Sequence, residues 1–412
     1  MNHAAARRDK REKLMKRNPT SFLLAVIVLA LSSTARATTT WYVNGTTGND
    51  TNNCLSTTTP CKTIGHSISL AASGDSIMVA AATYTENLTI SKSLTIIGSG
   101  ASTTIIDGGG VATVVTISSN AGSVALSNFS IRDGLATHGG GVNNSGTLTI
   151  NRCIVTANRT VLVAQAFGGG IYNAAVLTIN DSEISGNTAT ASNRNVQYAY
   201  GGGIANNAGN LTINRSTISG NIAALGIANA SGHAYGGGIA ILGGTVSINN
   251  STIDGNVARS TFFGFGYGGG IYGGASIRNT TISGNGASYG GGLYQGGIQN
   301  SIVAYNSAQR QGANCYGAVS LGYNLSSDKS CNFNGTGDIN NTNPNLGPLQ
   351  HNGGPTRTRA LPSGSPAIDA GDPGGCTDRS GLLLKTDQRG MPRPDAEDKT
   401  GCDMGAYESQ SD

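Results

Sequence analysis

The stretch that decides the fold runs from His138 to Asn306, and its clearest copy reads Tyr200-Gly-Gly-Gly-Ile-Ala-Asn-Asn-Ala-Gly-Asn-Leu-Thr-Ile-Asn-Arg-Ser-Thr-Ile-Ser-Gly-Asn221. Six copies of this phrase follow one another. Each opens with an aromatic residue or histidine before three glycines, and the openings are His138, Phe167, Tyr200, Tyr235, Tyr267 and Tyr289. Self-similarity of this kind is typical of repeat architectures.

Aligned copies give columns that barely vary. One column holds Ile150, Ile179, Ile213, Ile248, Ile277 and Ile298. A second holds Cys153, Ser182, Ser216, Ser251, Thr280 and Ser301, and a third holds Val155, Ile184, Ile218, Ile253, Ile282 and Val303. The copies end on Asn158, Asn187, Asn221, Asn256, Asn285 and Asn306. The aliphatic residues alternate with polar ones, so the columns predict short strands with one buried face.

Strands this short cannot bury a face alone, so each copy has to pack against its neighbours. Stacking the copies in parallel joins the columns into one core and pairs every backbone with the coils above and below. Glycine and asparagine suit the sharp corners, and stacked asparagine side chains can bond along their column. The alternatives are a β-sandwich and a β-propeller. A propeller needs about 40 residues per blade, whereas Gly268 and Gly290 are 22 residues apart. We therefore predict an all-β, single-stranded parallel β-helix.

Insertions separate the longer copies, and all of them fall between the column asparagine and the next glycine triplet. The inserted runs are 159–167, 188–200, 222–235 and 257–267, with 286–289 left in the short copy. In a stacked array these runs emerge along one edge, which is often a binding edge. The alternative is that loops at this edge are simply tolerated.

A secretory signal is predicted at residues 1–37. Seven basic residues between Arg7 and Arg17 precede the apolar run 22–31, and Ala35-Arg36-Ala37 supplies a cleavage site. Without this leader, 18 basic and 20 acidic residues remain. The remainder has no basic patch and no second long apolar run, so neither a nucleic-acid partner nor a membrane span is predicted.

The seven cysteines suit an oxidising compartment. Local spacing suggests three pairs, namely Cys54 with Cys61, Cys315 with Cys331, and Cys376 with Cys402, although spacing alone does not fix connectivity. Cys153 is left over. It occupies an inward-facing serine and threonine column, so we expect a buried, inert thiol there, with a reactive cysteine as the alternative.

The region before the repeats predicts an amphipathic helix and irregular first coils. Residues 63–72 are predicted to form a short amphipathic helix with Ile64, Ile68 and Leu70 as its apolar residues, and this helix can cap the core. The phrases Gly74-Asp-Ser-Ile-Met-Val79 and Thr104-Ile-Ile-Asp-Gly108 follow. Here the chain resembles the pectin-lyase-like superfamily. That resemblance implies a right-handed helix, which the periodicity does not show.

After Asn306 the repeat fades and four phrases of another kind follow. They are Asn343-Pro-Asn-Leu-Gly-Pro-Leu-Gln-His-Asn-Gly-Gly-Pro-Thr356, Gly364-Ser-Pro-Ala-Ile-Asp-Ala-Gly371, Asp387-Gln-Arg-Gly-Met-Pro-Arg393 and Cys402-Asp-Met-Gly-Ala-Tyr-Glu408. In this order they resemble the choice-of-anchor Q domain at the C-terminus of many secreted bacterial β-helix proteins. The sorting tail that gives that family its name does not follow Glu408, so we expect free secretion or non-covalent attachment.

The superfamily includes enzymes that cleave acidic polysaccharides, so the resemblance raises the possibility of paired carboxylates in the columns. A hydrolase of this kind needs two carboxylates roughly 5 to 9.5 Å apart, and a calcium-dependent lyase needs several acidic groups around the metal. The acidic residues of the repeats are scattered at Asp133, Asp181, Glu183 and Asp254, the last in a column of Ser, Thr and Ala. No catalytic residue, metal or cofactor is therefore predicted.

One charged column is expected at an outer corner. It consists of Arg152, Asp181, Arg215, Asn250 and Arg278. It can hold a polyuronate carboxylate, but a solvent-exposed ladder that contributes below ~1 kcal/mol per pair is the simpler interpretation.

The aromatic column is the strongest indication of function. Phe167, Tyr200, Tyr235, Tyr267 and Tyr289 recur at the inserted edge, with His138 as the first member. Such rings can form a flat strip that stacks on sugar faces. Alternatively they stack on one another and close the bases of the loops, since aromatic pairs contribute about 0.5–1.5 kcal/mol each beyond burial.

Together these features predict a leader at 1–37, a cap and irregular coils at 38–137 and regular repeats at 138–306. Terminal coils at 307–342 and the Q-like region at 343–412 follow. We expect a non-catalytic secreted or cell-surface protein that binds polysaccharide or a cell-surface glycan along the inserted edge. The alternatives are a lyase or glycoside hydrolase acting on acidic glycans, and a structural envelope component without a ligand.

Overall fold

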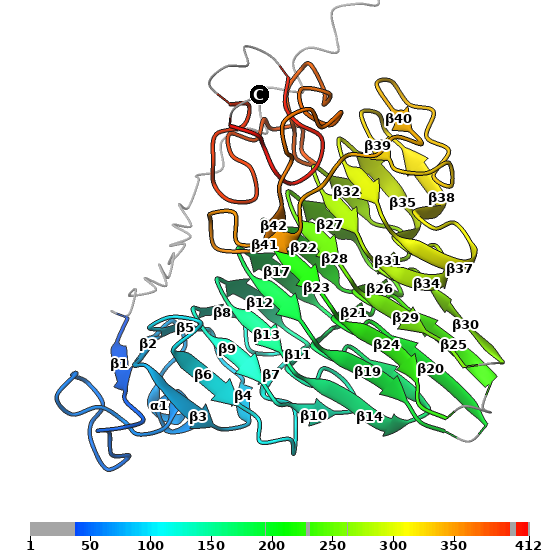
Figure 1. Cartoon of the computed structure of the whole chain (residues 1–412). Helices are drawn as coiled ribbons and strands as arrows, with labels where there is room; N and C mark the ends of the chain where they lie inside the picture. The colour runs from blue at the N-terminus through cyan, green and yellow to red at the C-terminus, as the bar shows by residue number, and fades with distance from the viewer. Residues whose placement is uncertain (1–37, 194, 228–230, 262, 396–400, 411–412) are drawn as a thin grey trace, which may run out of the picture. The chain divides into compact units, whose positions relative to one another are not determined.

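The aliphatic columns form the buried core of a right-handed parallel β-helix (Figure 1). The computed structural model describes residues 38–193, 195–227, 231–261, 263–395 and 401–410, and the predicted leader lies outside them. Ile150, Ile179 and Ile213 are partners in register, and each is fully buried. The predicted columns are therefore confirmed.

Each coil contributes to three sheets, called A, B and C. Sheet A has 18 strands, generally two from each coil: β1 (Thr40–Val43), β2 (Ser76–Val79), β4 (Leu88–Ile90), β5 (Leu94–Gly98), β7 (Val115–Ile117), β8 (Ser123–Ser127), β11 (Val142–Asn144), β12 (Thr147–Asn151), β16 (Ile171–Asn173), β17 (Val176–Asn180), β21 (Ile204–Asn206), β22 (Asn210–Asn214), β26 (Ile239–Ile241), β27 (Val246–Asn249), β31 (Ile271–Tyr272), β32 (Ser276–Arg278), β35 (Leu293–Gln299) and β38 (Cys315–Ser320).

Sheet B follows sheet A across a sharp corner. It has 11 strands: β3 (Ala82–Thr85), β6 (Thr104–Asp107), β9 (Ser130–Arg132), β13 (Ile154–Thr156), β18 (Glu183–Ser185), β23 (Thr217–Ser219), β28 (Thr252–Asp254), β33 (Thr281–Ser283), β36 (Ile302–Ala304), β39 (Leu325–Ser326) and β40 (Ile339–Asn340).

Sheet C is built largely from the insertions. Its 11 strands are β10 (Leu135–Ala136), β14 (Arg159–Val163), β15 (Gln165–Phe167), β19 (Thr188–Ala191), β20 (Val196–Tyr200), β24 (Ile222–Leu225), β25 (Ser231–Tyr235), β29 (Val257–Arg259), β30 (Gly264–Tyr267), β34 (Gly286–Tyr289) and β37 (Ser307–Gln311).

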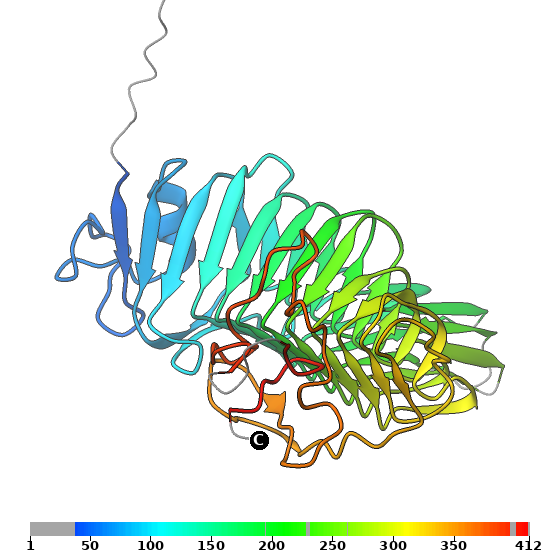
Figure 2. The same cartoon turned by 90° about the horizontal axis from the view of Figure 1, so that it is seen from above.

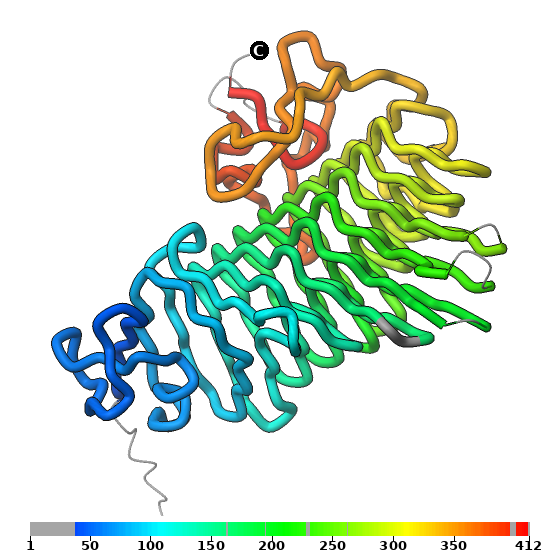
Figure 3. Tube along the Cα trace, turned by 60° about the horizontal axis from the view of Figure 1, so that its bottom comes forward, coloured from blue at the N-terminus to red at the C-terminus, as the bar shows by residue number. Residues whose placement is uncertain are grey.

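The insertions emerge along one edge, as predicted, but they are paired strands rather than loops. In each long coil one strand runs out and the next returns, and both pair with their counterparts in neighbouring coils, so β19 pairs with β24 and β20 with β25. We call these two layers the fin (Figures 1 and 3). The strands of the insertions thus pair their backbones within sheet C.

Alanine fills the space between the two layers of the fin. The buried cluster consists of Ala166, Ala189, Ala191, Ala199, Ala223, Ala234, Ala258 and Ala287. At Gly266 even a methyl group has no room, because an added Cβ would lie 2.0 Å from the carbonyl oxygen of Ala258. The fin is therefore a thin, closely packed pair of sheets.

The glycine triplets return the chain from the fin to sheet A. Gly201 has φ 64°, which a residue with a side chain rarely adopts. An added Cβ at Gly202 would lie 2.3 Å from the carbonyl carbon of Ile222. The triplets thus combine a left-handed turn with a close approach between backbones.

A ladder of buried asparagine side chains marks the corner between sheets B and C. The amide of Asn187 donates to Oδ1 of Asn221 at 3.0 Å, and Asn221 donates to Asn256 at 2.9 Å. Each amide also donates to a backbone carbonyl, which for Asn221 is that of Ile184. The expected stacking of column asparagines is confirmed.

The helix α1 (Ile64–Leu70) lies at the N-terminal end and contacts β1, β2 and β4. Its N-terminal amides donate to the carboxylate of Glu86, at 2.9 Å from Ile64 and 2.8 Å from Gly65. Ile64 and Ile68 are buried as predicted, but Leu70 is 42% exposed. The short helix turns Leu70 away from the core, so that part of the predicted apolar face is wrong.

All three expected disulfides are present, joining Cys54 to Cys61, Cys315 to Cys331 and Cys376 to Cys402. Cys153 is buried and free, and burial raises the pKa of its thiol to about 12. This environment keeps the thiol protonated.

Residues 343–395 and 401–410, called here the C-terminal segment, pack along the stacked coils (Figure 2). The segment includes a small antiparallel hairpin of β41 (Leu349–Gln350) and β42 (Thr358–Arg359). Gln388 lies at the centre of the contact: its side-chain amide donates to Thr217 at 3.0 Å and its oxygen accepts from Thr252 at 2.6 Å. The segment is thus hydrogen-bonded directly to sheet B.

Candidate functional site

The aromatic column lies at the end of the returning strands of the fin, directly before the glycine triplets. Neighbouring rings in the order His138, Phe167, Tyr200, Tyr235, Tyr267 and Tyr289 have centroids 5.1, 4.9, 5.0, 5.4 and 5.4 Å apart. Their planes differ by 7° to 13°. The rings therefore stack on one another along the helix axis.

This stacking changes how the column can meet a ligand. A ring inside the stack, such as Tyr235, has Tyr200 on one face and Tyr267 on the other. Its faces are therefore occupied, and the expected flat strip of exposed ring faces is not what the structure presents. The ring edges and hydroxyl groups remain for contact with a ligand.

A second row of rings, missed in the sequence, lies on sheet A. It consists of Tyr172, Tyr272, Tyr294 and Tyr316, and Ala205 and Ala240 occupy the two register positions between the first two. Tyr272 approaches Tyr235 at 4.7 Å, and Tyr294 approaches Tyr267 at 5.3 Å. The rings of sheet A and the fin thus contact one another across the glycine turns.

A third row lies two residues before the first, on the same returning strands. Tyr198, His233 and Phe265 are register partners, with centroids 6.2 and 5.9 Å apart. The three rows together, called the aromatic surface, contain nine of the chain's 14 tyrosines. The sequence signal for the second row is a tyrosine directly after the aliphatic residue that follows the glycines, as at Tyr172, Tyr272 and Tyr294.

The aromatic surface is uncharged near neutral pH apart from one arginine. Burial raises the pKa of the hydroxyls of Tyr200, Tyr235 and Tyr267, and burial lowers the pKa of His138 and His233. The guanidinium of Arg310 lies 4.8 Å from the ring centre of Phe265. The surface therefore offers hydroxyl groups and ring edges rather than ionic groups.

The predicted charged column differs from the corner that the structure shows. The corner residues with positive φ are Arg152, Asp181, Arg215, Asn250 and Asn279, whereas Arg278 pairs in register with Asn249 inside sheet A. The prediction that Arg278 belongs to the corner column is therefore wrong by one residue, and Asn279 occupies that position. Arg215 forms two hydrogen bonds to Asp181, at 2.7 and 2.8 Å. Asn250 is 3% exposed and donates to the carbonyl of Thr386, so this part of the column is covered by the C-terminal segment.

The acidic residues of sheet B hold the C-terminal segment. Glu183 pairs with Arg357 at 3.3 Å, and Asp254 pairs with Arg359 at 2.5 Å. A cleft of about 330 Å³ beside them has Asp254 as its one carboxylate. Each of these two carboxylates has an arginine partner from the C-terminal segment, so this face contributes to attachment of the segment.

A second cleft, of about 480 Å³, lies between sheet A and residues 378–384. Its lining combines polar groups of Thr212, Asn214, Arg215, Ser247, Asn249 and Asn250 with Asp378, Arg379, Ser380 and Leu384. Asp378 is the one carboxylate among them, and it is bonded to its own turn through Ser380 and Leu382.

Two carboxylates do meet at Arg132. Its Nε lies 3.0 Å from Asp107 and 3.4 Å from Asp133. The side chain of Asp133 is 49% exposed, and the guanidinium between the two acids compensates their charge. Here two carboxylates share one guanidinium.

One cluster of three potential metal-binding side chains occurs in the described part of the chain, at Cys54, Cys61 and His66. Its two sulfur atoms are joined in a disulfide, so they are not available as thiolate ligands. Within the same residues, no helix is long and apolar enough to cross a membrane.

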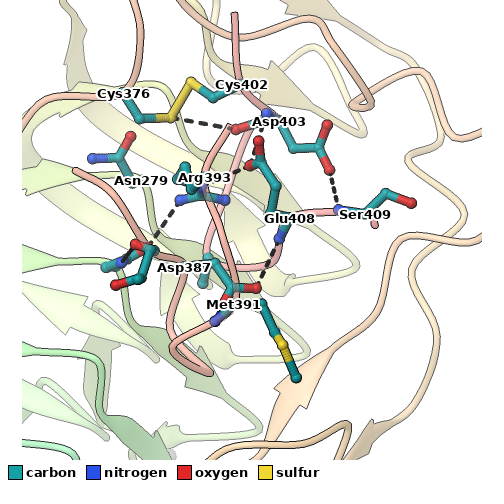
Figure 4. Close-up of polar contacts among 12 residues, drawn as sticks. Asn279, Cys376, Asp387, Met391, Arg393, Cys402, Asp403, Glu408 and Ser409 are labelled. Atoms are coloured by element: carbon teal, nitrogen blue, oxygen red, sulfur yellow. Dashed lines mark hydrogen bonds and ion pairs between the residues drawn. A yellow bond between two sulfur atoms is a disulfide. The ribbon is translucent and has the colours of Figure 1, made fainter. Parts of the chain in front are cut away.

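Two of the C-terminal phrases, 387–393 and 402–408, meet in one buried cluster (Figure 4). Arg393 pairs with Glu408 at 2.6 Å, and Arg389 pairs with Asp387 at 2.7 Å and lies over the ring of Tyr407 at 3.5 Å. The phrase 364–371 joins through backbone bonds, such as that from Met404 to Ala367 at 2.9 Å. The phrase 343–356 joins through Thr356, whose hydroxyl accepts from the side-chain amide of Gln388 at 2.9 Å. Burial raises the pKa of Glu408 to about 7. The phrases are thus explained by packing within the segment.

Comparisons with known proteins give backbone similarity alone. No protein-family model matches the chain, and no curated protein matches it in sequence. A pectate lyase, Pel9A, is similar with a TM-score of 0.48 and 15% identity over 90% of this chain and 97% of that one. The pectin methylesterase PemA from Erwinia chrysanthemi has a TM-score of 0.34 and 12% identity over 68% and 81% of the two chains. A pectin methylesterase mutant in complex with hexasaccharide IV has a TM-score of 0.33 and 15% identity over 73% and 82%. Function therefore has to be inferred from this chain's own residues.

Proposed function

We propose that this is a non-catalytic extracellular or cell-surface protein that binds polysaccharide or a cell-surface glycan along the aromatic surface. The observation that carries this proposal is the first row of rings, which continues without interruption from His138 to Tyr289, with the other two rows beside it. Tyrosine combines apolar contact area with a hydroxyl group that both donates and accepts hydrogen bonds. A long polymer lying along the helix axis would meet an equivalent ring in each coil.

The placement of the acidic groups supports a binding role over catalysis. Glu183 and Asp254 are engaged by arginines of the C-terminal segment, and Asp181 is engaged by Arg215. A general acid or nucleophile has to reach the substrate in a defined protonation state. These carboxylates instead stabilise the fold.

Secretion is supported by the predicted leader and by the three disulfides. The Q-like C-terminal segment is proposed to serve non-covalent surface attachment. Its own packing on sheet B leaves the aromatic surface, on sheet A and the fin, to the ligand.

The second candidate function is cleavage of an acidic glycan, and the pair Asp107 and Asp133 at Arg132 is the observation that favours it. In this case Arg132 would hold a substrate carboxylate and one of the acids would transfer a proton. Replacing Asp133 by asparagine would then abolish product formation.

The test is incubation of the chain from Thr38 onward with neutral and acidic polysaccharides, with and without calcium. Retained protein and newly formed reducing or unsaturated ends are measured together. We expect retention without new ends. New ends would establish an enzyme, whereas neither retention nor new ends would favour a structural component of the envelope.

A further inference from the structure

We infer that the polysaccharide recognised by the aromatic surface is uncharged. This inference rests on the proposed function and specifies the ligand class of the same site. It follows from the charges, hydrogen-bonding groups and ring orientation of the aromatic surface.

Four charged groups of the described repeats lie away from the aromatic surface. Arg215 and Asp181 are paired at the corner between sheets A and B, and Glu183 and Asp254 face the C-terminal segment. Among the described residues of the three rows and their register partners, the side chains are aromatic rings, histidines, alanines, asparagine and glutamine, including Asn143 and Gln165. Arg310, at Phe265, is the one cation in contact with the rings.

An acidic polysaccharide carries a carboxylate on most of its sugars. Each carboxylate brought against the rings would lose hydration, and that loss is costly without a compensating charge or hydrogen bond. A single arginine cannot compensate a row of carboxylates that extends over several coils. A neutral polymer has no such cost, and its hydroxyl groups find partners in the tyrosine hydroxyls.

The orientation of the rings agrees with this ligand class. Because the faces of Tyr200, Tyr235 and Tyr267 are stacked, their edges and hydroxyls are directed toward a ligand. No described group bonds to the hydroxyls of Tyr235 and Tyr267, whereas the hydroxyl of Tyr172 accepts from Asn207 at 2.8 Å. Those two hydroxyls are therefore available to a neutral, hydroxyl-rich chain.

The test uses polygalacturonate and its fully methyl-esterified form, which share a backbone and differ in charge, together with a neutral β-glucan. Retention of the chain from Thr38 onward is measured by affinity electrophoresis at low and high salt. We expect retention by at least one of the two neutral polymers, little change with salt, and no retention by polygalacturonate. Charge-dependent binding would weaken with salt because exposed charges are screened.

Four variants locate the binding. Tyr235→Phe and Tyr267→Phe keep the ring stack and remove one hydroxyl, so each should weaken retention by about 2- to 10-fold. Tyr42→Phe, at the N-terminal end of sheet A, is the matched control and should leave retention unchanged. Arg310→Ala should also leave retention by neutral polymers unchanged.

The outcomes separate this inference from the proposed function. Salt-sensitive retention by polygalacturonate that is lost in Arg310→Ala would overturn the inference and leave glycan binding in place. Equal retention by charged and uncharged polymers would also overturn it. Retention by none of the polymers would overturn the proposed function and the inference with it.

Discussion

Arg359 in β42 and Asp254 in β28 form an ion pair although 105 residues separate them in the chain. The Asp254 side chain is 9% exposed and that of Arg359 is 18% exposed. The pair therefore lies in an environment where loss of one partner leaves the other with little hydration. It is one of the contacts that hold the C-terminal segment on sheet B.

Replacing Asp254 by asparagine should loosen the C-terminal segment. We expect a loss of about 1–3 kcal/mol, less than for a fully buried pair because both side chains retain some exposure. Limited proteolysis near the hairpin of β41 and β42 should become faster. The control Asp133→Asn changes a half-exposed carboxylate outside this interface and should leave proteolysis there unchanged. Equal proteolysis of both variants would show that the pair does not hold the segment.

The asparagine ladder predicts a second effect on stability. Asn221→Ala removes the partner of the Asn187 backbone amide and of the Ile184 carbonyl, both within the buried corner. With each orphaned group costing about 1–3 kcal/mol, we expect a loss of about 2–5 kcal/mol in chemical denaturation. Asn210→Ala, at an exposed position, should change stability by less than about 0.5 kcal/mol. Similar values for both variants would refute a structural role for the ladder.

The thin fin predicts sensitivity to a single methyl group. Gly266→Ala places a Cβ 2.0 Å from the carbonyl oxygen of Ala258, so the two layers must separate. We expect destabilisation of about 1–3 kcal/mol or more, measured by thermal unfolding. Gly274→Ala is the control, since nothing lies within 4 Å of its added Cβ. A neutral Gly266→Ala variant would mean that the layers are not in contact.

Glu408 predicts a pH dependence of stability. Burial raises its pKa in the folded protein to about 7, above the ordinary value of 4.5. The folded state therefore holds this proton more tightly than the unfolded chain. The protonated Glu408 side chain therefore contributes up to about 3 kcal/mol to the free energy of unfolding. This contribution is present below pH 4.5 and is lost as the pH rises to about 7.

Chemical denaturation between pH 4 and pH 8 checks this sign. Glu408→Gln keeps a polar side chain that does not titrate, so its stability should vary less over this range than that of the unaltered protein. The assignment would be contradicted if the unaltered protein became more stable between pH 4.5 and pH 7 and if the Glu408→Gln variant lacked this gain in stability.

We predict that thiol reagents reach Cys153 only after the protein unfolds. Burial raises its pKa to about 12, so both access and ionisation oppose reaction. With the three disulfides intact, a thiol reagent should label no cysteine in the folded protein and one in denaturant. Rapid labelling of the folded protein would support the alternative of a reactive cysteine.

The core could be predicted from the sequence because its signal repeats. Ile213 and Ile218 recur at the same positions in copy after copy, and a column in the alignment becomes a column in space. The same regularity predicted the stacking of Asn221 on its neighbours. Arg278 was assigned to the corner column because its charge matches that of Arg152 and Arg215. Its distance from Ile277 in the chain instead places Asn279 at the corner.

The fin and the second row of rings were harder to predict. The insertions differ in length, so their pairing has no column to reveal it, although Ala189 and Ala191 alternate with polar residues in the manner of a strand. The contact of Tyr294 with Tyr267 depends on how tightly the glycine turn folds the fin back onto sheet A. The partners of Asp254 lie 105 residues away, and no local pattern indicates them.

The attachment of the C-terminal segment has a mechanical consequence. The segment is bonded to residues of several successive coils, from Glu183 in β18 through Thr217 and Thr252 to Thr281 in β33. Coils that touch only their neighbours peel away one at a time under tension. Here a pull on the C-terminal end is shared among many lateral bonds loaded together, so this end of the helix is the one suited to bear force.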